Sequence, residues 1–376
     1  MKIAFVISKF FPIPGGGETN TYALATELSN AGHEVTVITD KTLSNSNKGF
    51  AHQFQLRYID GLIDFSERGG RLRLPLAGLH EVLQELRPQV THVHNYLPYL
   101  LVRQLRNQLA GGVVLSFHNT PQPPNRAIGY FEDPALDLGM ARTLLQSDEY
   151  DRLLVGADVY EQFATGQGVS RDRIRRAPLG INVARFQAAG QARGLPDRLR
   201  QIILPSRIIR RKGILEAVQA MIGLSEYQLN ILCLANPEDP AYADEVLESI
   251  DSLGLRERVA YPKTVPDYGE LPAWYAKSDI VLLPSYYEGL GLAAIEGLAA
   301  ERPLVATTAA GFSEFLTPEN SRLVPAKDPG AIADAIQELD DPRLVERMVR
   351  EGSQTAARYD IKRQAVLTAA VYEEVC

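Results

Sequence analysis

Two glutamates, Glu288 and Glu296, are separated by seven residues and lie beside a glycine-containing turn. An apolar run at 279–285 precedes them and a helix-like segment at 292–300 begins between them, so they lie where a buried strand gives way to a helix. Glu296 has mostly apolar neighbours, and a carboxylate there costs free energy unless hydrogen-bond donors reach it. A diol would serve as donor. The alternative is that Glu296 faces water and Glu288 simply suits a helix N-terminus.

A second charged group follows the strand-like run at 202–206. Arg207 and Lys212 lie in a loop with two further arginines, and a helix is expected from this loop to about Met221. A guanidinium fork and an ammonium point charge at a strand-to-helix junction suit a pyrophosphate. A solvated basic turn is the alternative interpretation.

Three glycines, Gly15, Gly16 and Gly17, form a third motif between a strand at 3–8 and a helix expected to end near Ala31. Glycine lets the backbone approach a ligand closely, and the start of a helix offers unpaired N–H groups to an anion. The same pattern also fits an ordinary tight turn.

Two histidines stand at or just after the ends of predicted strands. His118 follows the strand at 113–117, and His94 ends the strand at 90–94. A polar side chain at the carboxyl end of a central strand lies on the ligand side of the sheet, although a single histidine is more often structural. His118 is therefore the active-site candidate in this half of the chain, and His94 is the weaker one.

These motifs are spaced along two successive series of strands and helices. Such alternation predicts an α/β protein with two doubly wound parallel sheets, which bind ligands outside the carboxyl ends of their strands. We expect an N-terminal domain over 1–182, joined by a C-terminal helix at about 360–376, and a second domain over 183–359. Residues 120–147 are predicted to form a long irregular loop, and 187–196 a flexible hinge region.

The composition indicates a globular protein of two domains and excludes several classes of function. The chain has 376 residues, 45% of them hydrophobic, which is enough for two soluble domains, and its net charge of −7 argues against nucleic acid as the main partner. Its two cysteines, Cys233 and Cys376, leave no disulfide framework or cysteine metal site. No signal peptide or membrane span is recognised, so a cytoplasmic location is expected. A short basic and apolar stretch at 68–76 is the one weak indication of peripheral membrane contact.

Together the motifs resemble those of the retaining glycosyltransferases of family 4, also called glycosyltransferase group 1, over nearly the whole chain. The positions that carry this resemblance are Gly15, Gly16, Glu18, Gly32, His33, Arg207, Lys212 and the run from Glu288 to Glu296. That family has the GT-B fold. The resemblance therefore implies two Rossmann-like domains that face each other across a cleft, with a C-terminal helix that crosses back to the first domain.

The resemblance also implies a role for each motif. In the family, the residue that matches Glu296 binds the ribose hydroxyls, and the one that matches Glu288 lies beside the donor sugar. Arg207 and Lys212 match residues that bind the donor diphosphate and stabilise its departure, while His118 matches a histidine that contacts the transferred sugar. The expected catalytic residues are His118, Arg207, Lys212 and Glu288. The expected donor-binding residues are Gly15, Gly16, Arg207, Lys212, Glu288, Gly289, Leu290, Gly291 and Glu296.

The expected donor is a nucleotide diphospho-sugar, and no metal or other cofactor is expected because fixed cations take the place of the metal. The expected acceptor is a saccharide or glycoconjugate on the side of Asn119, Tyr130 and Phe131, in the loop after His118. Lys263 stands where the family generally has a glycine near the base, so the choice among UDP, GDP and ADP stays open.

Other functions fit the same pattern. A nucleotide-sugar 2-epimerase shares the fold and would release epimerised sugar without an acceptor, and a glycolipid transferase would work at a membrane surface. A phosphorylase of related fold would need a pyridoxal lysine, for which the sequence shows no motif. A non-catalytic binding module would not explain why the sequence has the full set of Gly16, His118, Arg207, Lys212, Glu288 and Glu296.

Overall fold

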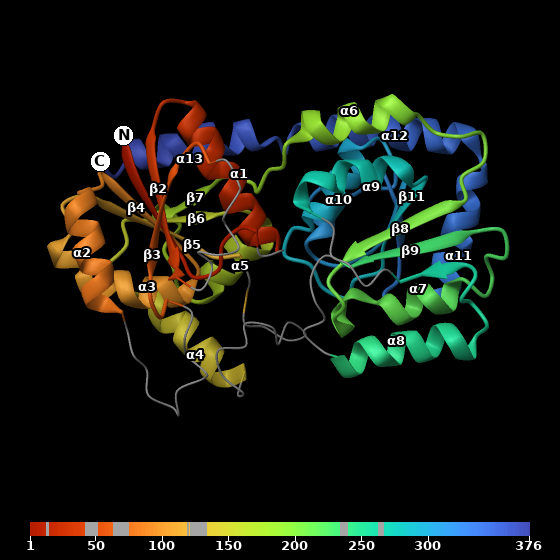
Figure 1. The fold of residues 1–376 in the computed structure, drawn as a ribbon, viewed down its shortest axis with the longest axis horizontal. Helices are drawn as coiled ribbons and strands as arrows, with labels where there is room; N and C mark the ends of the chain where they lie inside the picture. Colours follow the sequence, from red (N-terminus) through yellow and green to blue (C-terminus); the bar gives the residue numbers. More distant parts are fainter. Residues whose placement is uncertain are drawn as a thin grey trace. The chain divides into compact units, whose positions relative to one another are not determined.

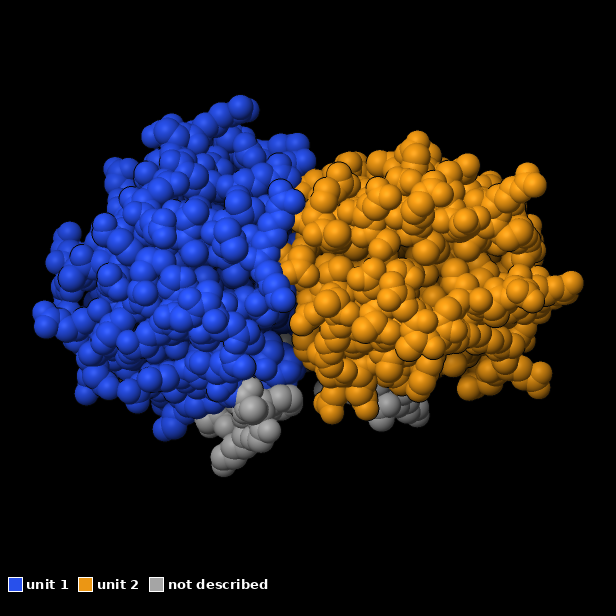
Figure 2. All heavy atoms as spheres, turned by 90° about the horizontal axis from the view of Figure 1, so that it is seen from above, with its two compact units in different colours: residues 1–180, 361–376 blue, residues 181–360 orange. Residues whose placement is uncertain are grey.

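The structure is a computed structural model of this chain. It describes residues 1–12, 15–41, 52–62, 75–118, 120, 134–233, 240–261 and 267–376. The chain divides into two compact units, coloured separately in Figure 2: unit 1 is Met1–Gly180 with Ile361–Cys376, and unit 2 is Ile181–Asp360. None of the helices within the described ranges combines the length and the apolar character that crossing a membrane requires.

Unit 1 is built on a parallel sheet with the strand order β3-β2-β1-β4-β5-β6-β7 (Figure 1). Its strands are β1 (Lys2–Ile7), β2 (Glu34–Asp40), β3 (Gln55–Ile59), β4 (Val90–His94), β5 (Gly112–Ser116), β6 (Arg152–Val155) and β7 (Ile174–Arg176). Nearly every residue of β1, β2, β4 and β5 is buried, as expected for parallel strands covered on both faces. The order reverses between β1 and β4, which is where such a sheet binds a ligand.

The end of the chain belongs to unit 1. The helices of this unit are α1 (Gly16–Asn30), α2 (Leu76–Leu86), α3 (Tyr96–Val102), α4 (Pro134–Leu145), α5 (Asp158–Gly166) and α13 (Ile361–Glu373). Asn20 on α1 and Gln364 on α13 exchange two amide hydrogen bonds of 2.7 and 3.0 Å, and Gln364 also accepts one from the backbone N–H of Gly180. Because these groups are buried, the bonds fix α13 beside α1 (Figure 1), and the predicted return of the C-terminal helix is confirmed.

Unit 2 has a second parallel sheet, with the order β10-β9-β8-β11-β12-β13. Its strands are β8 (Gln201–Ser206), β9 (Gln228–Cys233), β10 (Val259–Ala260), β11 (Ile280–Leu283), β12 (Leu304–Thr307) and β13 (Arg322–Val324). Its helices are α6 (Val183–Arg193), α7 (Ile214–Ala220), α8 (Pro240–Ser252), α9 (Leu271–Lys277), α10 (Leu292–Ala299), α11 (Pro329–Gln337) and α12 (Pro342–Ala357). The order reverses between β8 and β11, which pair directly. Two doubly wound α/β units, as predicted, are therefore present.

The predicted hinge region at 187–196 is wrong, because most of it belongs to helix α6. The Asn182 side chain caps this helix by accepting a backbone hydrogen bond in its first turn, and Gly194 ends it with a φ of 69°. Gly190 lies so close to the backbone of Ala300 that a Cβ there would be 2.1 Å from the carbonyl oxygen. The polar sequence therefore reflects a half-exposed helix packed on α9 and α10 rather than a linker.

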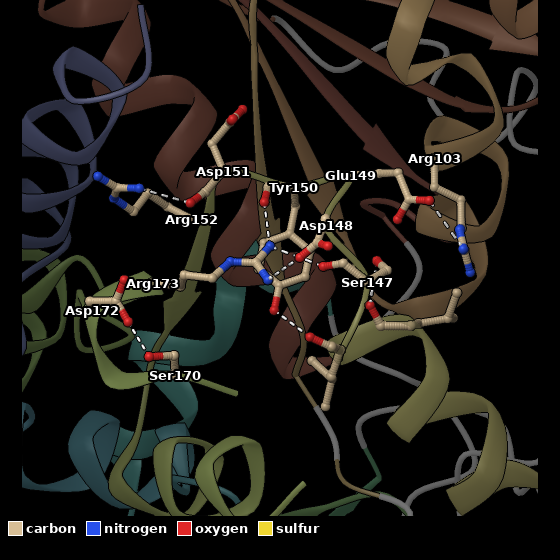
Figure 3. Close-up of polar contacts among 12 residues, drawn as sticks. Arg103, Ser147, Asp148, Glu149, Tyr150, Asp151, Arg152, Ser170, Asp172 and Arg173 are labelled. Carbon is tan, nitrogen blue, oxygen red and sulfur yellow. Dashed lines mark hydrogen bonds and ion pairs between the residues drawn. The ribbon is translucent and has the colours of Figure 1, made fainter. Parts of the chain in front are cut away.

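The irregular loop predicted at 120–147 is also partly wrong, since 134–145 form α4. Figure 3 shows the turn that follows this helix and leads into β6. Arg173 donates hydrogen bonds to the carbonyl oxygens of Ser147, at 3.0 Å, and Tyr150, and its guanidinium lies 3.9 Å from the centroid of the Tyr150 ring. These contacts are structural, and none of the residues labelled there belongs to the predicted site.

Candidate active site

The charged motifs of unit 2 meet where its strand order reverses. The loop 207–213 follows β8, the loop 284–291 follows β11, and these two strands are neighbours. Lys212 and Glu288 form an ion pair across the two loops, and Ser285 Oγ donates a hydrogen bond of 2.8 Å to the same carboxylate oxygen. The side chains of the pair are only 15% and 10% exposed. The sequence predicted both loops, but it did not predict that these two charges would pair.

The surroundings keep this pair ionised. Burial disfavours the Glu288 carboxylate, but the charges of Lys212 and Arg211 outweigh it and lower the pKa of Glu288. Burial lowers the pKa of Lys212, Glu288 opposes this shift, and Arg211 and Arg207 add to it. The loop after β8 therefore concentrates positive charge beyond what one carboxylate neutralises. Such a loop suits a ligand that carries several negative charges.

Glycines let the loops at this edge of the sheet pack closely. Gly213 has a φ of 65°, and a Cβ there would lie 2.1 Å from the carbonyl oxygen of Pro284. A Cβ on Gly311, in the loop after β12, would lie 2.5 Å from the carbonyl oxygen of Gly289. The loop that carries Glu288 is thus held between the backbones of its two neighbours.

Replacing Gly213 by alanine should therefore disrupt the site, and Gly254 offers a matched control. Gly254 has a similar φ of 67°, but a Cβ there would meet nothing within 4 Å. Both variants incur the cost of a left-handed residue, about 1–2 kcal/mol, while only Gly213→Ala also forces the loops apart. Urea denaturation should show a larger loss of unfolding free energy for Gly213→Ala, and calorimetry a loss of affinity for the expected nucleotide diphosphate for that variant alone. Equal losses in both measurements would contradict the packing argument.

Glu296 lies on α10, and the interpretation that it faces water is wrong. Only 7% of the residue is exposed, and Tyr275 on α9 donates a hydrogen bond of 2.7 Å to its Oε2. Burial raises the pKa of Glu296 to about 7, although the hydrogen bond from Tyr275 acts in the opposite direction. A buried carboxylate gains free energy from each further donor that reaches it, which suits a diol. Tyr275 was missed, because no local pattern connects positions 275 and 296.

The turn between β11 and α10 contains the other predicted donor-binding positions. Gly291 precedes the helix with a φ of 90°, and a Cβ there would lie 2.4 Å from the ring of Phe312. The Leu290 side chain is buried, so this residue would meet a ligand through its backbone.

In unit 1 the histidines and the glycine motif come together where the strand order reverses. Gly15 precedes α1 and Gly16 is its first residue. A Cβ on Gly17 would lie 3.2 Å from the side chain of His118, so the missing side chain of Gly17 makes room for the histidine. His118 Nε2 and His94 Nδ1 lie 3.0 Å apart. The two histidine candidates are therefore direct neighbours.

A third histidine, His92, was not predicted to lie near the site. It stands two residues before His94 on β4, so both side chains lie on the same face of the sheet. Its ring nitrogens lie 2.6 Å from Tyr372 Oη and 2.8 Å from Ser116 Oγ. The alternation His-x-His within a strand was the sequence signal that could have identified it.

Burial keeps these three rings neutral near pH 7. It lowers the pKa of His92 to about 3, that of His118 to about 4, and that of His94 well below its usual value. A cavity of about 10 Å³, room for roughly one water molecule, lies against the rings. Its polar lining consists of Asn20, His92, His94, Ser116, His118 and Gln364.

The predicted acceptor residues Asn119, Tyr130 and Phe131 lie outside the described residues, as does Lys263. Across the ranges that the structure does describe, no three His, Cys, Asp or Glu side chains converge so that they could hold a metal ion.

Comparison with known proteins assigns a family to each half of the chain. The model described as Glycosyltransferase Family 4 matches residues 14–185, and the model described as Glycosyl transferases group 1 matches residues 187–355. The lipopolysaccharide core biosynthesis mannosyltransferase LpsB of Rhizobium meliloti is 29% identical over 52% of this chain, and the match spans only 59% of that relative. A D-inositol 3-phosphate glycosyltransferase of Paenarthrobacter aurescens is 25% identical over 96% of this chain and 94% of the relative.

The fold comparison agrees with the family models. The structure of a sucrose-phosphate synthase from Thermosynechococcus elongatus matches with a TM-score of 0.84 and 23% identity, over 99% of this chain and 98% of that one. This match shows the GT-B fold. With one matching domain in each unit, the chain belongs to the glycosyltransferases of the family 4 and group 1 type.

Proposed function

We propose that this protein moves a sugar from a nucleotide diphospho-sugar to a hydroxyl group of a saccharide or glycoconjugate, with retention of anomeric configuration and without a metal ion. The observation that supports this most directly is the buried Lys212–Glu288 pair, with Arg207 in the same loop, where the strand order of unit 2 reverses. Glu296, on helix α10 after the loop that carries Glu288, supplies a buried acceptor for the ribose.

The leaving group accounts for the two cations. As the bond between the anomeric carbon and the diphosphate breaks, negative charge grows on the phosphate oxygens and positive charge on the sugar. Arg207 and Lys212 stabilise the first of these charges, and Lys212 is already held in place by its ion pair with Glu288. Glu288, held ionised by Lys212 and Ser285, accepts hydrogen bonds from the donor sugar. The acceptor hydroxyl then attacks the face from which the diphosphate departs and passes its proton to the departing phosphate oxygen, so no enzyme nucleophile is needed.

The residues of unit 1 act on the sugar and the acceptor in this proposal. His118 contacts the transferred sugar, and Gly15 and Gly16 lie against the donor. The acceptor binds beside Tyr130 and Phe131, whose aromatic faces favour a sugar ring. These assignments rest on the family resemblance and on the place of His118 at the end of β5.

A panel of UDP-, GDP- and ADP-sugars with saccharide acceptors, followed by mass spectrometry, tests the proposal. We expect a new glycosidic bond whose configuration, measured by NMR coupling constants, matches that of the donor, at a rate that EDTA leaves nearly unchanged. Complete loss of activity with EDTA would contradict the metal-free mechanism. Epimerised sugar formed without an acceptor would favour the epimerase, and activity only on lipid-linked acceptors, with tight flotation on anionic vesicles, would favour the membrane-surface enzyme.

A further inference from the structure

Three histidines of unit 1, His92, His94 and His118, form a connected row. His92 and His94 share one face of β4, and His118 follows the adjacent strand β5. The ring centroids of His92 and His94 are 4.2 Å apart. Those of His94 and His118 are 5.4 Å apart, with only 14° between the ring planes. The polar contact that links the last two rings is the 3.0 Å approach of His94 Nδ1 to His118 Nε2.

The hydrogen bonds around His92 determine where its proton lies. Ser116 Oγ donates its single proton to the carbonyl oxygen of Leu154, at 2.9 Å, so it must accept from His92 Nε2–H. His92 Nδ1 then accepts from the hydroxyl of Tyr372. His92 is thus fully paired, and its role is structural, because it connects β4 to the C-terminal helix.

The hydrogen bonds around His94 and His118 determine the positions of their protons in the same way. Thr21 Oγ1 donates its proton to the carbonyl oxygen of Gly17, at 2.8 Å, so toward His94 Nδ1, at 3.3 Å, it can only accept. His94 therefore carries its proton on Nδ1, and this N–H also faces His118 Nε2. With Nε2 as the acceptor, neutral His118 carries its own proton on Nδ1.

We propose that His94 is a positioning residue for glycosyl transfer: it holds His118 as the Nδ1–H tautomer, so that His118 donates a hydrogen bond to a hydroxyl of the transferred sugar. This inference rests on the proposed function, which places His118 beside that sugar. His118 Nδ1 is shielded from solvent and has no hydrogen-bond partner among the described residues. A hydroxyl that reaches it therefore satisfies a buried donor that is otherwise costly to leave unpaired.

The other contacts of His118 fix its place but not its proton. Its backbone N–H donates to Asn95 Oδ1 at 3.0 Å, and its carbonyl oxygen accepts from Tyr160 Oη at 2.6 Å. Gly17 lies against its side chain. Within the described part of the chain, His94 is the group that decides which ring nitrogen of His118 carries the proton.

The ¹⁵N NMR shifts of the imidazole nitrogens report the tautomer directly. We expect His118 in the wild type to be protonated at Nδ1. His94→Asn keeps an N–H close to the position of Nδ1 and should preserve that tautomer, whereas His94→Leu has nearly the same shape without a donor and should give a mixture of tautomers. A wild-type His118 protonated at Nε2, or an unchanged spectrum in His94→Leu, would overturn the proposal.

Steady-state kinetics test whether His94 contributes to sugar transfer. The probe is the nucleotide sugar that proves active in the donor panel. His94→Leu should lower kcat about three- to tenfold, the scale of one lost hydrogen bond, and change KM by less than about twofold. His94→Asn should restore most of the rate. His92→Leu is the control for lost stability, because it removes an equally buried ring from the same face and should lower Tm without changing the tautomer of His118.

The outcomes separate this inference from the proposed function. A wild-type rate in His94→Leu, together with an altered tautomer, would refute the role in transfer. If the wild type transfers no sugar from any donor, the proposed function is wrong, and so is the proposed contact between His118 and the sugar. The spectra alone would then still decide whether His94 sets the tautomer.

Discussion

Replacing Lys212 by alanine is expected to lower kcat about 100- to 1,000-fold and to weaken nucleotide diphosphate binding much less. The reason is that the charge on the diphosphate oxygens is greatest as the bond to the sugar breaks, so the ammonium contributes most in the transition state. Arg207→Ala should show the same division between kcat and binding. Steady-state rates and calorimetry with the free nucleotide diphosphate measure the two effects separately.

Arg210 provides the control for this experiment. It lies in the same loop, but its side chain is 58% exposed and pairs with Glu245, so Arg210→Ala should leave both parameters near their wild-type values. Lys212→Ala also leaves Glu288 buried without its cation, which should cost roughly 3–5 kcal/mol of unfolding free energy. Rates must therefore be measured below the unfolding transition of the variant. Equal losses in turnover and binding would show that Lys212 only anchors the ligand.

The affinity for a nucleotide diphosphate should rise as the pH increases through about 7, the pKa to which burial raises Glu296. The ionised carboxylate is an acceptor only and can take both hydrogen bonds of a ribose diol, whereas the protonated form gives up part of this capacity. Glu296→Gln should remove the pH dependence, and Glu296→Ala should weaken binding by roughly 1–3 kcal/mol. Calorimetry between pH 6 and 8 measures both.

The matched ligand for this test is a 2′,3′-dideoxynucleoside diphosphate. The terminal phosphate titrates near pH 6 on its own, and the dideoxy ligand keeps that phosphate but lacks the diol. The difference between the two ligands therefore isolates Glu296. If both show the same dependence on pH, or if Glu296→Ala binds both as the wild type does, the ribose assignment is wrong.

The same residue should affect folding in the opposite direction. The pKa of Glu296 is about 7 in the folded protein against its usual 4.5, so the folded state holds the proton more tightly than the unfolded state. Its contribution to the free energy of unfolding is full below pH 4.5 and is lost as the pH rises through about 7. Tyr275→Phe removes the bond that lowers this pKa and should shift both transitions to higher pH.

The bounds of several buried strands were determined by the sequence alone. The strands at 90–94, 280–283 and 304–307 have the predicted bounds residue for residue. A buried parallel strand is a short continuous apolar run, so its limits are visible without knowing its neighbours. The same reasoning placed Arg207 and Glu288 in loops at the carboxyl ends of strands, where the structure has them.

The contacts that make a site were decided only by the tertiary structure. Lys212 meets Glu288 across 76 residues, Tyr275 meets Glu296 across 21, and His94 meets His118 across 24. Each contact joins two different elements, so it depends on which strands and helices are neighbours and in which register.

The hinge predicted at 187–196 failed for the same physical reason. A polar stretch becomes helix α6 because α9 and α10 cover its apolar side, and those partners lie roughly a hundred residues away in the chain. Apolar periodicity and turn residues act over a few neighbouring positions, so the sequence reveals the elements that they specify. The burial of a side chain, the pairing of its charge and the tautomer of a histidine depend on contacts between different elements. Only the folded chain therefore determines them.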